Sequence, residues 1–90
     1  MGNEIKIEGD LQTIDIDNSS RINRIGYLAK KQELYITFSK GTVYKYFDVP
    51  VEVFMDFVET YKKGESVGKY FEKHIRFNYD FQKFYMPLMI

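Results

Sequence analysis

The stretch "ESVGKY", residues 65–70, combines side chains that could hold an anion. Ser66 stands where the N-cap of a helix is expected, Gly68 leaves backbone N–H groups of the first turn unshielded, and Lys69 adds an ammonium group. Phosphate groups bind at helix N-termini, because unpaired N–H groups and the positive end of the helix dipole lie there. The pattern predicts a phosphate site, while Ser66 and Gly68 equally suit a plain cap and close packing against a sheet.

Two tyrosines and an arginine could extend this site toward a nucleotide. Tyr44 and Tyr46 stand two residues apart in "TVYKYFDVP", so on an extended chain they share one face. Rings on an open sheet face stack on nucleic-acid bases, whereas rings on a covered face pack in a core. Arg76 follows Lys69 by about two helical turns, so on a straight helix it would contact a neighbouring phosphate, or the turn at Asn78-Tyr79, rather than the same phosphate.

Catalytic and metal-binding arrangements are hard to assemble from this chain. It has one histidine, His74, and no cysteine, and it carries no G-x-S-x-G, H-E-x-x-H or phosphate-loop motif. His74 lies at the edge of a predicted apolar helix face, which favours a packing or capping role. Asp15 and Asp17 can share a strand face, but a solvated surface is the simpler interpretation of that pair. We therefore expect a non-catalytic protein without a metal or cofactor.

The composition is that of a small domain whose charges are separated along the chain. The 90 residues are 44% hydrophobic and 29% charged with zero net charge, which disfavours a surface that grips long polyanions. Residues 1–18 carry a net charge of −4, so residues 19–90 carry +4 and can form a basic face. The start "MGNEIKIEGD" lacks the regions of a signal peptide, and no apolar run is long enough to cross a bilayer. We expect a cytoplasmic protein with no membrane partner.

The strands that must position the tyrosines are predicted clearly. β-Branched and aromatic residues recur with period two, which predicts strands near 22–28, 33–38 and 42–48. In the connection "FSKGT", a type I turn followed by Gly41 as a left-handed bulge requires only glycine to be special, unlike a two-residue loop on Lys40-Gly41. That register places Tyr44 and Tyr46 on one face with Leu34, Ile36 and Phe38. The two tyrosines are thus expected to be at least partly core residues.

Helices and a tail are predicted after residue 48. A first helix over "PVEVFMDFVETYKK" would be capped by Asp48, with Pro50 at its first position and a buried face of Val51, Phe54, Val58 and Tyr61. Ser66 would cap a second helix over "VGKYFEKHIRFN", residues 67–78. The apolar tail "YDFQKFYMPLMI" either packs across the sheet or makes an interface.

These elements predict a single α+β domain over residues 1–90. An antiparallel sheet of three to five strands, with a hairpin near 33–48, would be packed on one side by the two C-terminal helices. The opening "NEIKIEGDLQTIDIDNSS" adds two short strands or one strand with an irregular acidic arm.

Several short motifs together resemble the KTSC domain, named after the C-terminus of some lysyl-tRNA synthetases. The resemblance covers about residues 16–80 and leaves out the acidic arm and the apolar tail. The family pattern reads Ser-Ser-x-Ile, Ile-Gly-Tyr, Phe-x-x-Gly, Tyr-x-Tyr, Val-Pro, Ser-x-Gly-x-x-Phe and Ile-Arg. The matching residues of this chain are Ser19, Ser20, Ile22, Ile25, Gly26, Tyr27, Phe38, Gly41, Tyr44, Tyr46, Val49, Pro50, Ser66, Gly68, Phe71, Ile75 and Arg76.

The resemblance implies a little about function. The family occurs attached to synthetases and as free-standing small proteins of bacteria and phages, so a protein of a bacterial cell, encoded by the bacterium or by a phage, is expected. An RNA-binding role has been proposed for the family, and no activity is established. The family usually has an aspartate after Gly-Tyr, where this chain has Leu28, so no role of that carboxylate carries over.

Two classes of function remain open. The first is a non-catalytic module that binds nucleic acid, with RNA implied by the resemblance, or a phosphate-bearing nucleotide; its residues would be Tyr44, Tyr46, Ser66, Gly68, Lys69 and Arg76. The second is a protein-interaction or homo-oligomeric assembly module without a nucleic-acid ligand. Self-association would then use the apolar residues Phe84, Tyr85, Met86, Leu88, Met89 and Ile90.

Overall fold

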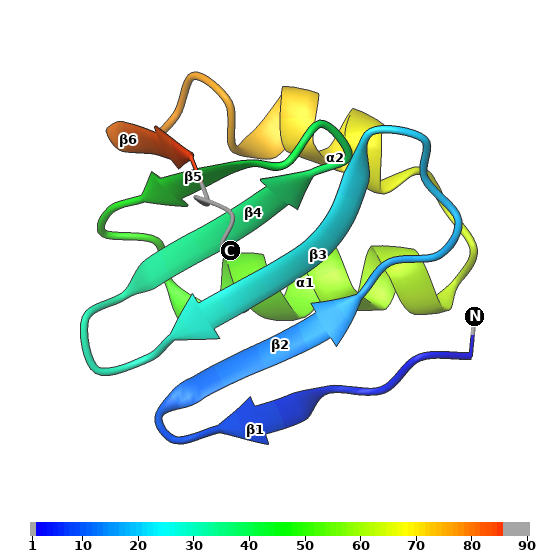
Figure 1. The fold of residues 1–90 in the computed structure, drawn as a ribbon, viewed down its shortest axis with the longest axis horizontal. Coiled ribbons are helices and arrows are strands. Elements are labelled where there is room, and N and C mark those ends of the chain that lie inside the picture. Colours follow the sequence, from blue (N-terminus) through cyan, green and yellow to red (C-terminus); the bar gives the residue numbers. More distant parts are fainter. Residues whose placement is uncertain (1, 86–90) are drawn as a thin grey trace.

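An antiparallel sheet of six strands forms the centre of the computed structural model, which describes residues 2–85 (Figure 1). The strands follow one another across the sheet in chain order, and two helices stand in the chain between β5 and β6. Both helices lie behind the sheet in Figure 1 and cover one of its faces. The elements are β1 (Lys6–Glu8), β2 (Leu11–Asp15), β3 (Ile22–Leu28), β4 (Glu33–Phe38), β5 (Thr42–Tyr46), α1 (Val51–Lys62), α2 (Val67–His74) and β6 (Phe81–Tyr85).

The predicted α+β class is confirmed, with a sheet one strand wider than the predicted maximum. The acidic arm forms two short strands, β1 and β2, which turn at Gly9 with φ of 65°. The additional strand is β6, which lies along β5 with Tyr46 opposite Phe81. It forms because β5 would otherwise present an unpaired row of N–H and C=O groups. The first part of the tail thus extends the sheet instead of crossing it.

The hairpin of β4 and β5 has the predicted register. Leu34 pairs with Tyr46, and Ile36 pairs with Tyr44. Gly41 adopts φ of 92°, and its N–H donates to the carbonyl of Phe38 over 2.9 Å. This left-handed position is the one that favours glycine. The register directs Tyr44 and Tyr46 toward the face that the helices cover.

The start of α1 differs from the prediction. Asp48 does not cap the helix, and the N-cap is Pro50, which makes no side-chain cap hydrogen bond. Asp48 instead takes a left-handed φ of 57°. The reason lies in Val49, which is fully buried and whose N–H donates to the carbonyl of Gln32 over 2.9 Å. The chain therefore enters the helix through the core, and strand β5 ends before Asp48.

The buried face of α1 is rotated relative to the predicted one. Phe54, Phe57 and Tyr61 are fully buried, and Val58 is buried beside them. Val51, predicted to be buried, is 42% exposed. Phe57 therefore belongs to the core, and Val51 does not.

The helix α2 begins as predicted and ends four residues early. The Oγ of Ser66 accepts the backbone N–H of Lys69 over 3.1 Å, so Ser66 is the N-cap. At the other end the N–H groups of Ile75 and Arg76 both donate to the carbonyl of Phe71, over 3.0 Å each. The chain then turns away from the helical path. Arg76 consequently lies beyond the helix rather than on its exposed face.

A tyrosine of β3 connects the sheet to the start of α1, and a glycine of β3 allows β2 to lie close to it. The hydroxyl of Tyr27 donates to the carbonyl of Val49 over 2.6 Å, and its ring stacks on Phe54 with 5.1 Å between centroids. At Gly26 a methyl group would lie 3.3 Å from Cγ2 of Thr13, so a side chain would push β2 away. These contacts give the Ile-Gly-Tyr and Val-Pro motifs structural roles.

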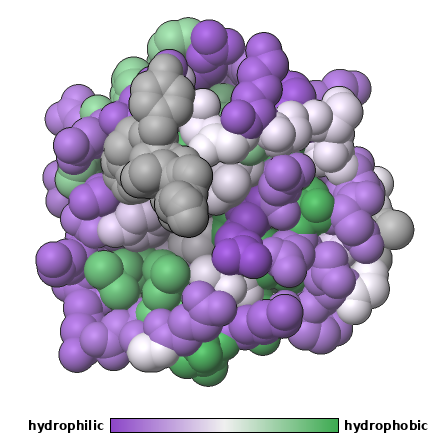
Figure 2. Space-filling model, in the orientation of Figure 1, coloured by the Kyte–Doolittle hydropathy of each residue, from purple (hydrophilic) through white to green (hydrophobic). Residues whose placement is uncertain are grey.

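The face of the sheet away from the helices carries mostly hydrophilic side chains (Figure 2). Arg24 and Asp15 form an ion pair on this face, with 2.7 Å between Nε and Oδ1. No helix within residues 2–85 is long and apolar enough to cross a membrane.

Candidate functional site

Aromatic rings pack against one another where the sheet edge meets α2. The ring of Tyr44 lies 5.3 Å from that of Phe38 and 5.4 Å from that of Phe81, measured between centroids. Tyr46 lies 5.7 Å from Phe81 and 5.9 Å from Phe71. Aromatic pairs at such distances contribute a favourable interaction energy in addition to that gained by burying their apolar area. The cluster joins β4, β5, α2 and β6 into one wall.

A cleft opens over these rings, with a cavity volume of about 590 Å³. This volume falls in the range of small-molecule sites. At its edge the ring of Phe77 is 83% exposed and that of Phe81 is 53% exposed. Among the described residues no carboxylate lines the cleft, and its basic lining consists of Arg21, Lys40, Arg76 and Lys83. The cleft therefore offers accessible rings and positive charge together.

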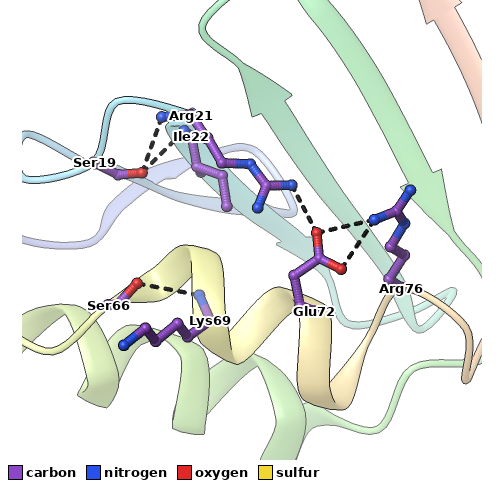
Figure 3. Close-up of polar contacts among 7 residues, drawn as sticks. All are labelled: Ser19, Arg21, Ile22, Ser66, Lys69, Glu72 and Arg76. Carbon is purple, nitrogen blue, oxygen red and sulfur yellow. Dashed lines mark hydrogen bonds and ion pairs between the residues drawn. The ribbon is translucent and has the colours of Figure 1, made fainter.

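Two of these arginines share one carboxylate (Figure 3). Nη2 of Arg21 lies 2.9 Å from Oε2 of Glu72, and Nη1 of Arg76 lies 3.0 Å from Oε1. Arg21 precedes β3, Arg76 follows α2, and Glu72 belongs to α2, so the contact ties the sheet to the helix. The hydrogen bond from Arg76, followed by that from Arg21, lowers the pKa of Glu72 below its usual value. The carboxylate is ionised at neutral pH.

The hydroxyl of Tyr46 is a neutral donor in the wall of the cleft. Burial, followed by the charge of Tyr44, raises the pKa of Tyr46 to about 12, and the nearby charge of Arg76 opposes this rise. The side chain is 1% exposed, yet it lines the cleft. At any physiological pH the phenol therefore keeps its proton.

A second, more open cavity of about 900 Å³ lies at the start of α2. Ser66, Gly68 and Lys69 line it together with the carboxylates of Glu65 and Glu72. The Oγ of Ser66 is engaged in the helix cap. A methyl group on Gly68 would meet its nearest neighbours at 3.8 Å, an ordinary contact, so close packing does not explain this glycine.

The structure divides the predicted site residues between the two cavities. Tyr44, Tyr46 and Arg76 come together in the aromatic cleft. The predicted phosphate residues Ser66, Gly68 and Lys69 lie in the cavity at the start of α2. Arg21 lines both cavities and is the link between them.

The residues that the sequence reasoning missed are Arg21, Phe77 and Phe81. Arg21 directly follows the Ser-Ser motif. The motif indicated that this loop matters but did not indicate a role for a charged side chain. Phe77 and Phe81 lie where a continuing helix and an apolar tail were predicted, so only the bend after α2 and the pairing of β6 place them at the cleft.

The residues predicted to drive self-association fall at the end of the described chain. Phe84 and Tyr85 close β6, opposite Val43 and Thr42. Met86, Leu88, Met89 and Ile90 lie outside the described residues.

Comparison with known families agrees with this fold and these motifs. The model of the KTSC domain family matches residues 18–79, and the chain belongs to this family. The match has nearly the bounds that the motifs predicted.

A solved structure has the same architecture. The crystal structure of a KTSC domain protein from Yersinia pestis superposes with a TM-score of 0.72 at 28% sequence identity, covering 82% of this chain and 97% of that one. Among curated proteins, none matches the chain.

Proposed function

We propose that this protein is a non-catalytic module that binds single-stranded nucleic acid, or a single nucleotide, in the aromatic cleft. The observation that carries the proposal is the exposed pair of rings, Phe77 and Phe81, beside the guanidinium of Arg76 in a cleft lined by basic side chains. A base would stack on the rings, and its phosphate would lie against the arginines. This arrangement matches the way single-stranded RNA is recognised in general, by stacking and charge together.

The magnitudes favour a short ligand. Stacking of a base on an aromatic side chain is worth on the order of 1 to 3 kcal/mol. Charge-assisted hydrogen bonds from arginine to phosphate are stronger than those between neutral groups. A protein of zero net charge gains little from long-range attraction to a polyanion. Local stacking and one or two phosphate contacts would therefore supply most of the affinity.

A base must be unpaired to reach the rings. The cleft lies between strands β4, β5 and β6 and the end of α2, and aromatic and basic side chains line it together. In a duplex the faces of the bases are stacked on their neighbours and are not available to a side chain. The proposal therefore excludes double-stranded RNA as the preferred ligand.

Fluorescence anisotropy with labelled oligouridine and a labelled RNA duplex tests the proposal. The variant Phe77→Ala removes a ring that is 83% exposed, so it leaves the core intact. We expect it to weaken oligouridine binding roughly 5- to 100-fold, as the loss of one stacked base requires. The matched control is Met55→Ala, which removes a half-exposed apolar side chain of α1 that lines neither cavity. Equal affinities of the two variants, or preference for the duplex, would contradict the proposal.

A further inference from the structure

The guanidiniums of Arg21 and Arg76 form a pair that depends on a third residue. Arg21 precedes both helices in the sequence and Arg76 follows them, and both line the aromatic cleft. Two like charges in one cleft repel each other unless a charge of opposite sign lies between them. Glu72 supplies that charge, with Nη1 of Arg76 at 3.0 and 3.1 Å from its two oxygens and Nη2 of Arg21 at 2.9 Å from Oε2.

The carboxylate of Glu72 contacts both arginines without lining the aromatic cleft. Glu72 lines the cavity at the start of α2 and is not among the residues that line the aromatic cleft. Each guanidinium has five N–H donors, and the contact with Glu72 uses only one nitrogen of each. Within residues 2–85 the remaining donors make no other hydrogen bond, and Nη1 of Arg21 lies on the side of Gly68, 3.8 Å from where a Cβ of that residue would stand.

Aromatic rings fix the two guanidiniums as well. The Cζ of Arg21 lies 5.8 Å from the centroid of the Phe71 ring, and that of Arg76 lies 5.0 Å from the centroid of the Phe77 ring. Cations over aromatic faces at such distances are attracted to the ring. Each arginine is therefore held at two points, by a ring and by Glu72, before any ligand arrives.

We propose that Arg21 and Arg76 act as one clamp for a single phosphate group and that Glu72 is the positioning residue of this clamp. The inference rests on the proposed function and deepens it: it assigns the phosphate of the bound nucleotide to a shared position between two arginines, rather than to the start of α2. The two arginines and Glu72 together carry a net charge of +1, which attracts a phosphate and equals in size the single negative charge of a phosphodiester. A pre-organised pair loses less conformational freedom on binding than two independent side chains.

An opposite role for Glu72 makes a different prediction. If its carboxylate occupied the phosphate position itself, removing its charge would free both arginines and strengthen binding. If Glu72 positions the arginines, removing its charge lets them separate and weakens binding. The sign of the effect of Glu72→Gln therefore decides between the two roles.

Titration of the isotope-labelled protein with uridine monophosphate, uridine and inorganic phosphate, followed by NMR, tests the clamp. We expect uridine monophosphate and phosphate to shift the Nε–Hε signals of Arg21 and Arg76 together, and uridine to shift only signals near the rings of Phe77 and Phe81. In Glu72→Gln the affinity for uridine monophosphate should fall about tenfold, the range for a charge-assisted hydrogen bond, and that for uridine should not change. The control Asp15→Asn removes the carboxylate partner of Arg24 on the opposite face and should change neither affinity.

A cycle of substitutions supplies a second readout. Because the two arginines would hold one phosphate, the losses in Arg21→Gln and Arg76→Gln should sum to more than the loss in the double variant, and this coupling should vanish when Glu72→Gln is also present.

The outcomes separate the clamp from the proposed function. Tighter or unchanged phosphate binding in Glu72→Gln, or a shift of only one arginine signal, would overturn the clamp while leaving nucleotide binding in place. Arginine shifts with phosphate, but none near the rings with uridine or oligouridine, would overturn the proposed function and keep an anion clamp. A wild-type protein in which neither the arginine signals nor those near the rings respond to any of these ligands would overturn both.

Discussion

The ring of Phe77 is the most exposed large apolar side chain among the described residues, and it lies at the edge of a cleft. A phenylalanine in that position gains nothing from burial, so its contribution to stability is small. Beside it, Arg76 lies over the ring and contacts Glu72 at the same time. Single residues in this cleft therefore divide into two kinds: exposed groups that a ligand can contact, and buried groups such as Tyr46 that hold the wall in place.

The hydroxyl of Tyr27 is one of the buried groups that hold the fold. Replacing Tyr27 with Phe leaves the carbonyl of Val49 without its 2.6 Å partner in the core, and we expect a loss of about 1–2 kcal/mol in the free energy of unfolding. Urea denaturation measures this loss. Tyr35→Phe is the control, because its hydroxyl bonds to the side chain of Glu33 in a half-buried position. A Tyr27→Phe variant as stable as the wild type would contradict this role of the hydroxyl.

The charge of Glu72 should contribute to stability in a pH-dependent way. Its pKa is lowered in the folded state by Arg76 and then Arg21, so the folded state favours the ionised form. The resulting stabilisation is complete well above the ordinary carboxyl pKa and is lost as the pH falls through the lowered value. The difference in unfolding free energy between wild type and Glu72→Gln should accordingly shrink from pH 7 to pH 3. A difference that stays constant over this range would contradict the ion pairs.

At the scale of elements, the bend after α2 and the pairing of β6 with β5 bring the cleft together. The bend takes Arg76 off the helix, and β6 places Phe81 beside Tyr46. Without either feature the tyrosines of β5 would lie on an open edge. The cleft is therefore a property of the segment between α2 and the end of the sheet, more than of the hairpin that carries the Tyr-x-Tyr motif.

Two glycines in different elements should respond to alanine in opposite directions. In α2, Gly68→Ala meets its nearest neighbours at 3.8 Å and should stabilise the protein by about 0.5–1 kcal/mol, because alanine favours a helix. In β3, Gly26→Ala would place a methyl group 3.3 Å from Thr13 and should destabilise the protein. Thermal unfolding of the two variants measures both effects.

The variant Gly68→Ala also tests where the phosphate binds. If the nucleotide occupies the aromatic cleft, Gly68→Ala should keep the wild-type affinity for oligouridine. A large loss of affinity with unchanged stability would return the phosphate to the start of α2.

The sequence predicted local features well where one residue decides them. Gly41 determined the register of the hairpin, and Ser66 determined the start of α2, because each position has special backbone or capping requirements. The cleft was predicted only in part. Tyr44, Tyr46 and Arg76, which were predicted as parts of one site, line one cleft, but Arg21 and Phe81 join them through contacts between segments distant in the chain. No local pattern encodes those contacts.

At the scale of the whole molecule, the zero net charge is the sum of an acidic region and a basic region at opposite edges of the sheet. The acidic residues 1–18 contribute β1 and β2, while the basic cleft lies at β5 and β6. Contacts such as that between Glu4 and Lys62, at 3.0 Å, hold the acidic segment against α1. The acidic residues are thereby kept away from the cleft that would receive a phosphate.

The tyrosines make the whole fold sensitive to alkali. Burial is the largest cause that raises the pKa of Tyr35, Tyr46 and Tyr70 to about 12. A raised pKa means that the folded state favours the neutral phenol, so this stabilisation is present below pH 10 and is lost as the pH rises toward 12. We expect cooperative unfolding in that interval, with tyrosinate absorbance and circular dichroism changing together. Tyrosinate formation near pH 10 for every tyrosine, without unfolding, would contradict the burial of these side chains.

We claim that the cleft binds a single-stranded nucleotide ligand. Native mass spectrometry with added oligouridine tests this binding and also reports the oligomeric state. We predict a complex of oligouridine with the wild-type protein that persists in Arg24→Ala and is lost in Arg76→Ala, two arginines with similar exposure of 49% and 50% and one ion pair each to a carboxylate. A bare, defined oligomer that leaves oligouridine unbound, or equal complexes in the two variants, would contradict the claim, and the bare oligomer would favour an assembly module.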